Sequence, residues 1–163
     1  MPLSMYQASV PVFAQVLTNL SGILTKGAAH AVAKKIDPAV MLGTRLIPDM
    51  FPLLRQVQIA TDHAKGACAR LGGRDVPAYP DTETDFEQLQ ARIQKTLNYV
   101  RSYAPADIDG SEDKEIVLTI AGNQRKFKGQ TYLLFHATTA YNILRGAGVE
   151  IGKRDFIGTI PGA

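Results

Sequence analysis

The chain has 163 residues, of which 45% are hydrophobic and 20% charged, and its formal net charge is +3. These proportions are typical of a globular protein and exclude a disordered or fibrous chain, and the length fits one domain over residues 1–163. No apolar run reaches the roughly 18 residues that a membrane-spanning helix needs, so we expect no membrane segment and a cytoplasmic location.

The first predicted helix starts near Met5, where apolar residues begin to recur at alternating spacings of three and four, the period of a helix. The residues of this stripe are Val10, Phe13, Leu17, Leu20 and Leu24. Pro11 lies inside the stripe, so we expect it either to kink the helix or to sit within its first turns. Residues 28–35 are compatible with a continuation. Asp37 then precedes Pro38, which predicts a short helical turn over residues 39–42.

A second long helix is predicted over residues 52–71, followed by a glycine pair that ends it. The residues of its inner face are Leu53, Val57, Ala60, Ala64, Cys68 and Leu71. The small residues in its second half would let a neighbouring helix approach closely. Cys68, the single cysteine, cannot form an internal disulfide, and we interpret it as a buried structural thiol. Gln56, Gln58 and Asp62 are interpreted as a solvated flank, with Gln56 also able to border a pocket.

The third helix is predicted to begin at Thr84 and Glu87, which have the spacing of a capping box, and to end before Pro105. The residues of its apolar stripe are Phe86, Leu89, Ile93, Leu97 and Val100. The polar residues expected to face away from the core are Glu87, Gln90, Arg92 and Lys95.

Between residues 115 and 128 the hydrophobic period changes, which predicts a small β-hairpin that must pack against the helices to be stable. The last long helix is predicted over residues 130–145, with Gly146 and Gly148 after it. The residues of its inner face are Leu133, Ala137, Ala140, Tyr141 and Leu144. Beyond it, Ile151 and Phe156 can dock the tail.

Three histidines, His30, His63 and His136, fall on different predicted helices, and only His136 lies near the apolar stripe of its helix. No two histidines have the spacing of a helical metal motif, so we predict no metal site and no cofactor. We interpret His136 as a buried, hydrogen-bonded residue that lines a pocket with Tyr141 and Gln56.

No serine lies in a nucleophile motif, so the catalytic residues, and whether the protein is an enzyme, stay open. The predicted hairpin carries Arg125, Lys126 and Lys128. A solvated strand face explains these basic residues better than contact with nucleic acid does.

Three stretches also carry a resemblance to a known family. They are MYQASVPVF at residues 5–13, PDMFPL and QVQIA between residues 48 and 60, and the segment from Phe135 and His136 through TAY at 139–141 to GKRDF at 152–156. They resemble the DUF1993 family of bacterial proteins of unknown function, which is similar to the DinB/YfiT-like helical bundles. The resemblance implies a mostly α, DinB-like four-helix bundle with a small β-hairpin before the last helix, and a homodimer as one possible assembly.

The resemblance also implies a possible metal site, since many members of that wider group bind a divalent metal through one histidine on the second helix and two on the last. Some members of the group are thiol-dependent transferases. Here Ala140 follows His136 by one turn, and Gln56 and Gln58 stand where a ligand is expected. A divalent metal is therefore kept only as an alternative.

The leading functional hypothesis is a small molecule bound in a pocket between helices, without a metal. The alternatives are a non-catalytic dimeric interaction module, a DinB-like metal-dependent transferase, and, least favoured, a nucleic-acid binder that uses the hairpin.

Overall fold

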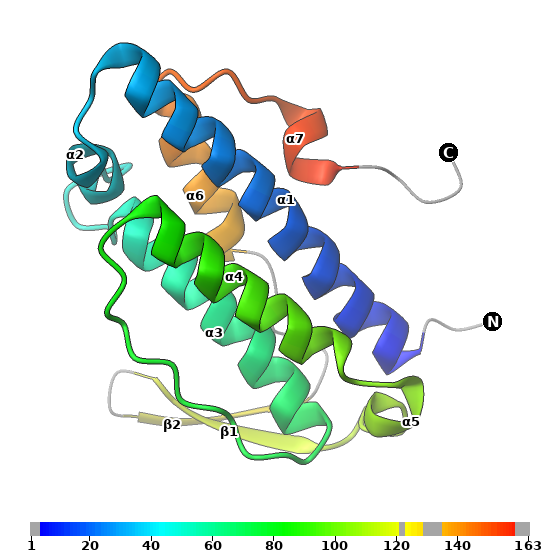
Figure 1. Ribbon diagram of the computed structural model, residues 1–163. Helices are drawn as coiled ribbons and strands as arrows, with labels where there is room; N and C mark the ends of the chain where they lie inside the picture. Colours follow the sequence, from blue (N-terminus) through cyan, green and yellow to red (C-terminus); the bar gives the residue numbers. More distant parts are fainter. Residues whose placement is uncertain (1–3, 121–122, 129–134, 159–163) are drawn as a thin grey trace.

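The computed structural model describes residues 4–120, 123–128 and 135–158, which contain seven helices and a two-stranded sheet (Figure 1). Helix α1 (Met5–Lys34) begins at a capping box: the Ser4 hydroxyl accepts a hydrogen bond from the Gln7 backbone, and the Gln7 side chain accepts one from the Ser4 backbone. Every residue of its predicted stripe is buried. Pro11 lies in the first turns and is exposed, and residues 28–34 continue the helix.

Helix α2 (Pro38–Gly43) forms where the Asp37-Pro38 pair predicts it, and the Asp37 side chain accepts from the Ala39 backbone at 2.8 Å. Helix α3 (Leu53–Leu71) follows and ends before Gly72. Its predicted inner face is buried, except that Ala60 is half-buried.

Helix α4 (Phe86–Arg101) buries its whole predicted stripe, but its N-cap is Asp85, one residue later than expected. The Asp85 side chain accepts from the Gln88 backbone, and the Gln88 side chain accepts from the Thr84 backbone, both at 2.8 Å. The Thr84–Glu87 capping box is therefore wrong, because a competing Asp–Gln pair has the same spacing one position further on.

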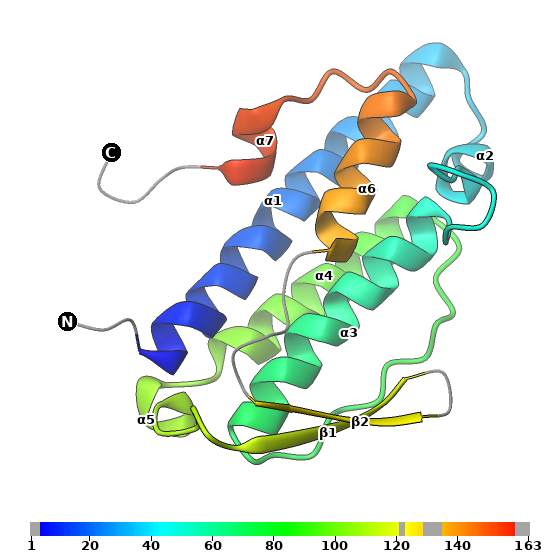
Figure 2. The same cartoon turned by 180° about the vertical axis from the view of Figure 1, so that it is seen from behind.

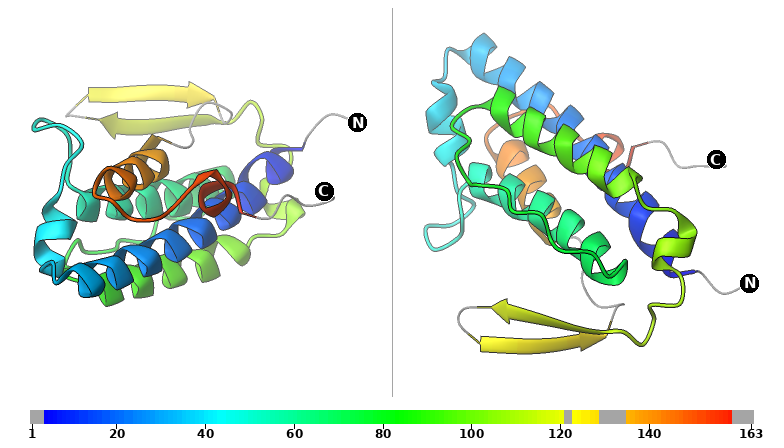
Figure 3. Two further views of the ribbon diagram at one scale, coloured as in Figure 1. Left: turned by 90° about the horizontal axis from the view of Figure 1, so that it is seen from above. Right: turned by 60° about the horizontal axis from the view of Figure 1, so that its bottom comes forward.

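Helices α3 and α4 run in the same direction. Gly72, directly after α3, lies so close to Tyr103, just after α4, that a Cβ on Gly72 would be 2.6 Å from the tyrosine ring. Midway along the helices, Asp62 of α3 pairs with Arg92 of α4. Residues 72–85, here named the crossover connection, must therefore return along the length of both helices, as Figure 1 and the right-hand view of Figure 3 show.

Strands β1 (Glu115–Ile120) and β2 (Asn123–Lys128) form the predicted hairpin, with Ile116 opposite Phe127. The hairpin follows the short helix α5 (Pro105–Ile108) and lies across the end of the bundle (Figures 1 and 2). Ile116 packs against the core, as the marginal stability of an isolated hairpin requires.

Helix α6 (Phe135–Gly146) lies between α1 and α3 (Figure 2) and buries Ala140 and Leu144. The predicted start of this helix, residues 130–134, lies outside the described residues. After it, α7 (Lys153–Ile157) docks on α1. Gln15 donates to the Ile157 carbonyl and Asn19 to the Phe156 carbonyl, both at 2.8 Å.

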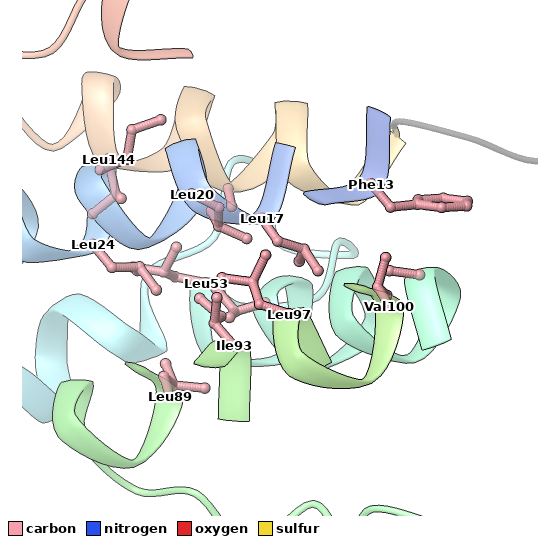
Figure 4. Close-up of a cluster of buried hydrophobic side chains, with 14 of the residues drawn as sticks. Phe13, Leu17, Leu20, Leu24, Leu53, Leu89, Ile93, Leu97, Val100 and Leu144 are labelled. Carbon is pink, nitrogen blue, oxygen red and sulfur yellow. The ribbon is translucent and has the colours of Figure 1, made fainter. Parts of the chain in front are cut away.

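One apolar core joins the helices, and Figure 4 shows side chains of α1, α3, α4 and α6 meeting in it. Helix α1 is long and apolar enough to cross a membrane by length and composition, contrary to the expectation from the sequence. However, Leu17, Leu20 and Leu24 of this helix are buried in the core. A core helix meets the same criterion, so these properties alone do not identify a membrane segment.

Candidate functional site

The surfaces that α3, α4 and the crossover connection turn toward one another hold a cluster of polar and charged side chains. Its centre is Arg92 of α4, whose side chain is only 2% exposed. The other members are Arg55, Gln58, Thr61, Asp62 and Lys65 of α3, and Asp81 and Glu83 of the crossover connection.

Every nitrogen of the Arg92 guanidinium is engaged. Nε donates to the Thr61 hydroxyl at 2.8 Å. Nη1 donates to the Pro80 carbonyl and the Glu83 carboxylate at 3.1 Å. Nη2 pairs with Asp62 at 2.8 Å and with Asp81 at 3.1 Å. Because an arginine has five N–H donors, Arg92 has none to spare for a ligand while these contacts hold.

The partners of Arg92 are themselves paired. Lys65 contacts Asp62 at 2.5 Å, and Arg55 pairs with Asp81. Gln58 donates to Glu83 at 2.9 Å. Three cations and three carboxylates therefore meet here and their charges cancel, which is the condition under which buried charges are tolerated.

Tyr79 of the crossover connection extends the cluster toward solvent. The centroid of its ring lies 4.5 Å from Lys65 Nζ, 4.1 Å from Lys95 Nζ and 5.7 Å from the Arg92 guanidinium carbon. A ring face attracts cations through its quadrupole, so these contacts help hold the connection on the helices. Burial raises the pKa of the Tyr79 hydroxyl, so the phenol stays neutral at physiological pH.

A cavity of about 330 Å³ lies beside this cluster, between the connection and α4. The polar residues that line it are Tyr79, Thr82, Glu83, Gln88, Arg92 and Lys95. Lys95 is exposed and has no carboxylate partner among the residues that the structure describes. The cavity therefore offers an ammonium group to a ligand, whereas the Arg92 beside it is saturated.

A second cavity, of about 360 Å³, lies at the C-terminal end of α3 and is lined in part by Ser111 and Lys114. The Ser111 hydroxyl is buried and, within the described chain, has no hydrogen-bond partner. Lys114 already donates to the Leu71 carbonyl at 3.1 Å. The other charged residues of this lining are Asp107 and Asp109, so the cavity does not offer the unpaired ammonium group that Lys95 supplies in the first.

The pocket residues predicted from the sequence are not brought into one described cavity. Gln56 is 1% exposed and donates to the Phe51 carbonyl at 3.1 Å. Tyr141 is half-buried and packs on Phe156, with the ring centroids 5.4 Å apart. His136 belongs to α6, but its side chain lies outside the described part, so its burial stays a prediction.

Two expectations about polar residues are wrong. Gln56 and Gln58 are buried, not a solvated flank, and Arg92 faces inward. Gln90 also turns toward α1, where it donates to the Ser21 carbonyl at 2.8 Å. The reason is that polar partners lie opposite these residues, and a buried polar group is stable when it is hydrogen-bonded.

The sequence reasoning missed the Arg92 cluster, although one signal for it was present. Arg92 lies three residues after Leu89 and four before Thr96, both of which are fully buried, so the three share one face of α4. The acidic partners Asp81 and Glu83 lie in a loop, where periodicity carries no information.

The metal site that the resemblance implies does not fit the residues described here. Ala140, one turn after His136, is buried and offers no ligand atom, and the side-chain amides of Gln56 and Gln58 are hydrogen-bonded elsewhere. Among the described side chains, no group of three or more His, Cys, Asp or Glu residues is placed to hold a metal ion. The expectation of no cofactor stays a prediction.

Comparison with known proteins identifies the family. A family model described as a domain of unknown function, DUF1993, matches residues 5–157. The chain belongs to the DUF1993 family. A crystal structure of a DinB family member from Shewanella denitrificans is similar to this DUF1993 protein at 38% identity, over 96% of this chain and 93% of that one, with a TM-score of 0.84. No curated protein matches the sequence. The resemblance and the mostly helical, DinB-like fold predicted from the sequence are therefore confirmed.

Proposed function

We propose that this DUF1993 protein binds a small anionic molecule in the cavity between α4 and the crossover connection, without a metal. The observation that carries the proposal is the Lys95 ammonium group, which lines the cavity, lies over the Tyr79 ring and has no described carboxylate partner. The volume of about 330 Å³ falls within the range of small-molecule sites.

Neutral donors complete the proposed site. The Thr82 hydroxyl lines the cavity without a hydrogen-bond partner among the described residues, and the Gln88 side chain uses its oxygen, leaving its amide nitrogen for a ligand. A carboxylate or phosphate group could accept hydrogen bonds from these donors and from Lys95. The Tyr79 ring supplies the apolar wall that such sites use to orient a ligand.

The test is a thermal-shift and calorimetric screen of acetate, succinate, inorganic phosphate and glycerol phosphate. We expect at least one anion to bind, Lys95→Gln to weaken its binding at least tenfold, and Lys34→Gln, at an exposed lysine of α1, to leave it unchanged. The proposal fails if no anion binds, or if Lys95→Gln binds as well as the native protein. Binding that requires a divalent ion would favour the metal-dependent transferase, and binding of oligonucleotides alone would favour the hairpin alternative.

A second candidate, the dimeric interaction module, is favoured by exposed apolar residues between α2 and α3. Leu46, Ile47 and Phe51 are 48%, 51% and 55% exposed. The small residues Ala64 and Cys68 of α3 are buried against other helices of the same chain, so they are not part of this exposed surface. A mass measurement in solution tests this candidate: a dimer that becomes a monomer in Ile47→Glu supports it, and a native monomer refutes it.

For either function we propose the cytoplasm as the location, which suits a protein with a free thiol.

A further inference from the structure

The crossover connection lies on α3 and α4 without burying a side chain. Every residue from Gly73 to Asp85 is exposed or half-buried. Its attachment is polar: Arg92 holds the Pro80 carbonyl, Asp81 and Glu83, while Gln58 also holds Glu83. Residues 80–83 are therefore attached through the two carboxylates that they insert into the Arg92 cluster, beside the contacts of the Tyr79 ring. The start of the segment is held separately, since Arg74 pairs with Asp107 at 3.1 Å.

The charges on the helices alone do not balance. Within the Arg92 cluster, Arg55, Lys65 and Arg92 supply three positive charges and Asp62 supplies one negative charge, which leaves a net charge of +2 on the cluster members that belong to α3 and α4. Lys95, which lines the adjoining cavity, lies outside this sum. Asp81 and Glu83 of the connection supply the two missing negative charges. Without them, the buried guanidinium of Arg92 would face uncompensated positive charge.

The two carboxylates contact Arg92 as an anionic ligand would. Both oxygens of Glu83 lie 3.1 Å from Nη1, and an oxygen of Asp81 lies 3.1 Å from Nη2. Carboxylates and phosphates are bound by arginine through this planar fork of donors. Glu83 and Arg92 also line the cavity that holds Lys95, so an anion in the cavity would lie next to the Glu83–Arg92 pair.

We infer that Asp81 and Glu83 are internal ligands of a doubly charged anion site on α3 and α4, and that a dianion displaces them from Arg92 and releases the crossover connection. The class of ligand is a phosphate monoester or a dicarboxylate, since either matches the +2 charge. This inference rests on the proposed function for the entry of the anion through the Lys95 cavity. It adds the ligand class and the segment that moves.

The experiment removes the two internal carboxylates with little change in size, in the double variant Asp81→Asn/Glu83→Gln. Calorimetric titration with inorganic phosphate and with succinate should show at least tenfold tighter binding than in the native protein, and the probe that gains more identifies the source. Backbone amides of residues 77–84 should exchange with deuterium faster in this variant, and also in the native protein saturated with the probe that it binds.

The matched control is Asp75→Asn/Glu87→Gln, which removes the same charge from exposed positions of the connection and α4 that take no part in the cluster. If the two double variants bind phosphate and succinate equally, the inference is overturned, because a general change in charge then explains the gain. If Asp81→Asn/Glu83→Gln does not fold, Glu83→Gln alone must show the gain in affinity.

The outcomes separate this inference from the proposed function. Lys95-dependent binding in the native protein with no gain in Asp81→Asn/Glu83→Gln would refute the internal ligands and leave the proposed function standing. Binding of a dianion only by that variant, independent of Lys95, would refute the proposed cavity and support the internal ligands.

Discussion

Arg92 is held inside the protein by three carboxylates, one from α3 and two from the crossover connection. Its side chain is 2% exposed, whereas Asp62 and Asp81 keep 34% and 36% of theirs in contact with solvent and Glu83 keeps 13%. If Arg92 is removed, the carboxylates can recover part of their hydration, so the loss should be smaller than for a fully buried pair.

We therefore expect Arg92→Met to lower the free energy of unfolding by about 2–4 kcal/mol, somewhat less than the roughly 3–5 kcal/mol that breaking a fully buried ion pair costs. Arg92→Lys should recover only part of this loss, because an ammonium group cannot reproduce the planar donor fork. Chemical denaturation measures both. Arg101→Met, at an exposed position of the same helix, should change the stability little, and an equally small effect for Arg92→Met would contradict the role described here.

Cys68 should be chemically inert in the native protein. The side chain is fully buried, and burial raises the pKa of the thiol to about 12, so almost no thiolate is present at neutral pH. A thiol reagent such as dithionitrobenzoate should react with one thiol per chain in denaturant and with almost none in the folded protein. Rapid reaction under native conditions would show that this end of the helix opens.

Replacing two glycines by alanine should change the stability of the protein in opposite directions. Gly22 lies within α1 and a Cβ there would meet no atom within 4 Å, so Gly22→Ala should stabilise the protein by about 0.5–1 kcal/mol through helix propensity. At Gly72 a Cβ would lie 2.6 Å from the Tyr103 ring, so Gly72→Ala should destabilise by about 1–3 kcal/mol. Thermal or chemical denaturation of both variants checks the signs. A stabilising Gly72→Ala would mean that the ends of α3 and α4 are further apart.

The docking of α7 on α1 should depend on pH through Asp155. A hydrogen bond from Lys26, together with one from the Gly152 backbone, holds the pKa of this carboxyl below its usual 3.8. Because the pKa of Asp155 is lower in the folded than in the unfolded protein, the ionised carboxylate stabilises the folded state when the pH is above the unfolded-state pKa. This stabilisation is lost as the pH falls through the folded-state pKa. Amides of α7 should therefore exchange faster as the pH falls below about 3.8, relative to the intrinsic rate.

At neutral pH, Asp155→Asn should likewise loosen α7, while Glu150→Gln, at an exposed position before this helix, should not. Equal exchange in the two variants would show that the contacts of Gln15 and Asn19 suffice to hold α7.

The molecule as a whole should unfold in one step, because a single core joins the helices. The chain has six tyrosines and no tryptophan, so tyrosine fluorescence and far-UV circular dichroism are suitable independent probes. Their denaturation curves should coincide. Two separated transitions would contradict the prediction of one domain over residues 1–163.

The helices and their buried faces could be predicted from the sequence, because an apolar stripe such as Leu17, Leu20 and Leu24 indicates both that a helix forms and which face of it is buried. The direction in which α4 runs beside α3 could not, since it depends on how residues 72–85 return. The Arg92 cluster depends on that direction: Asp62 and Arg92 are 30 residues apart in sequence and meet only when the helices are parallel. Arg92 and Gln58 were expected to face solvent because they are polar. Polarity alone does not show that partners such as Asp62 and Glu83 lie opposite them in the fold.

The parallel arrangement of α3 and α4 also bears on how fast the protein can fold. Antiparallel neighbours joined by a short loop make contacts that are local in sequence, whereas here 14 residues must be laid back along two helices. The N-terminal half of α1 is secured by still more distant partners: Tyr6 bonds to Asp109 across 103 residues, and Gln15 to Ile157 across 142. Because the folding rate falls as the average sequence separation of contacts rises, this helical protein should fold more slowly than an up-and-down bundle of the same size.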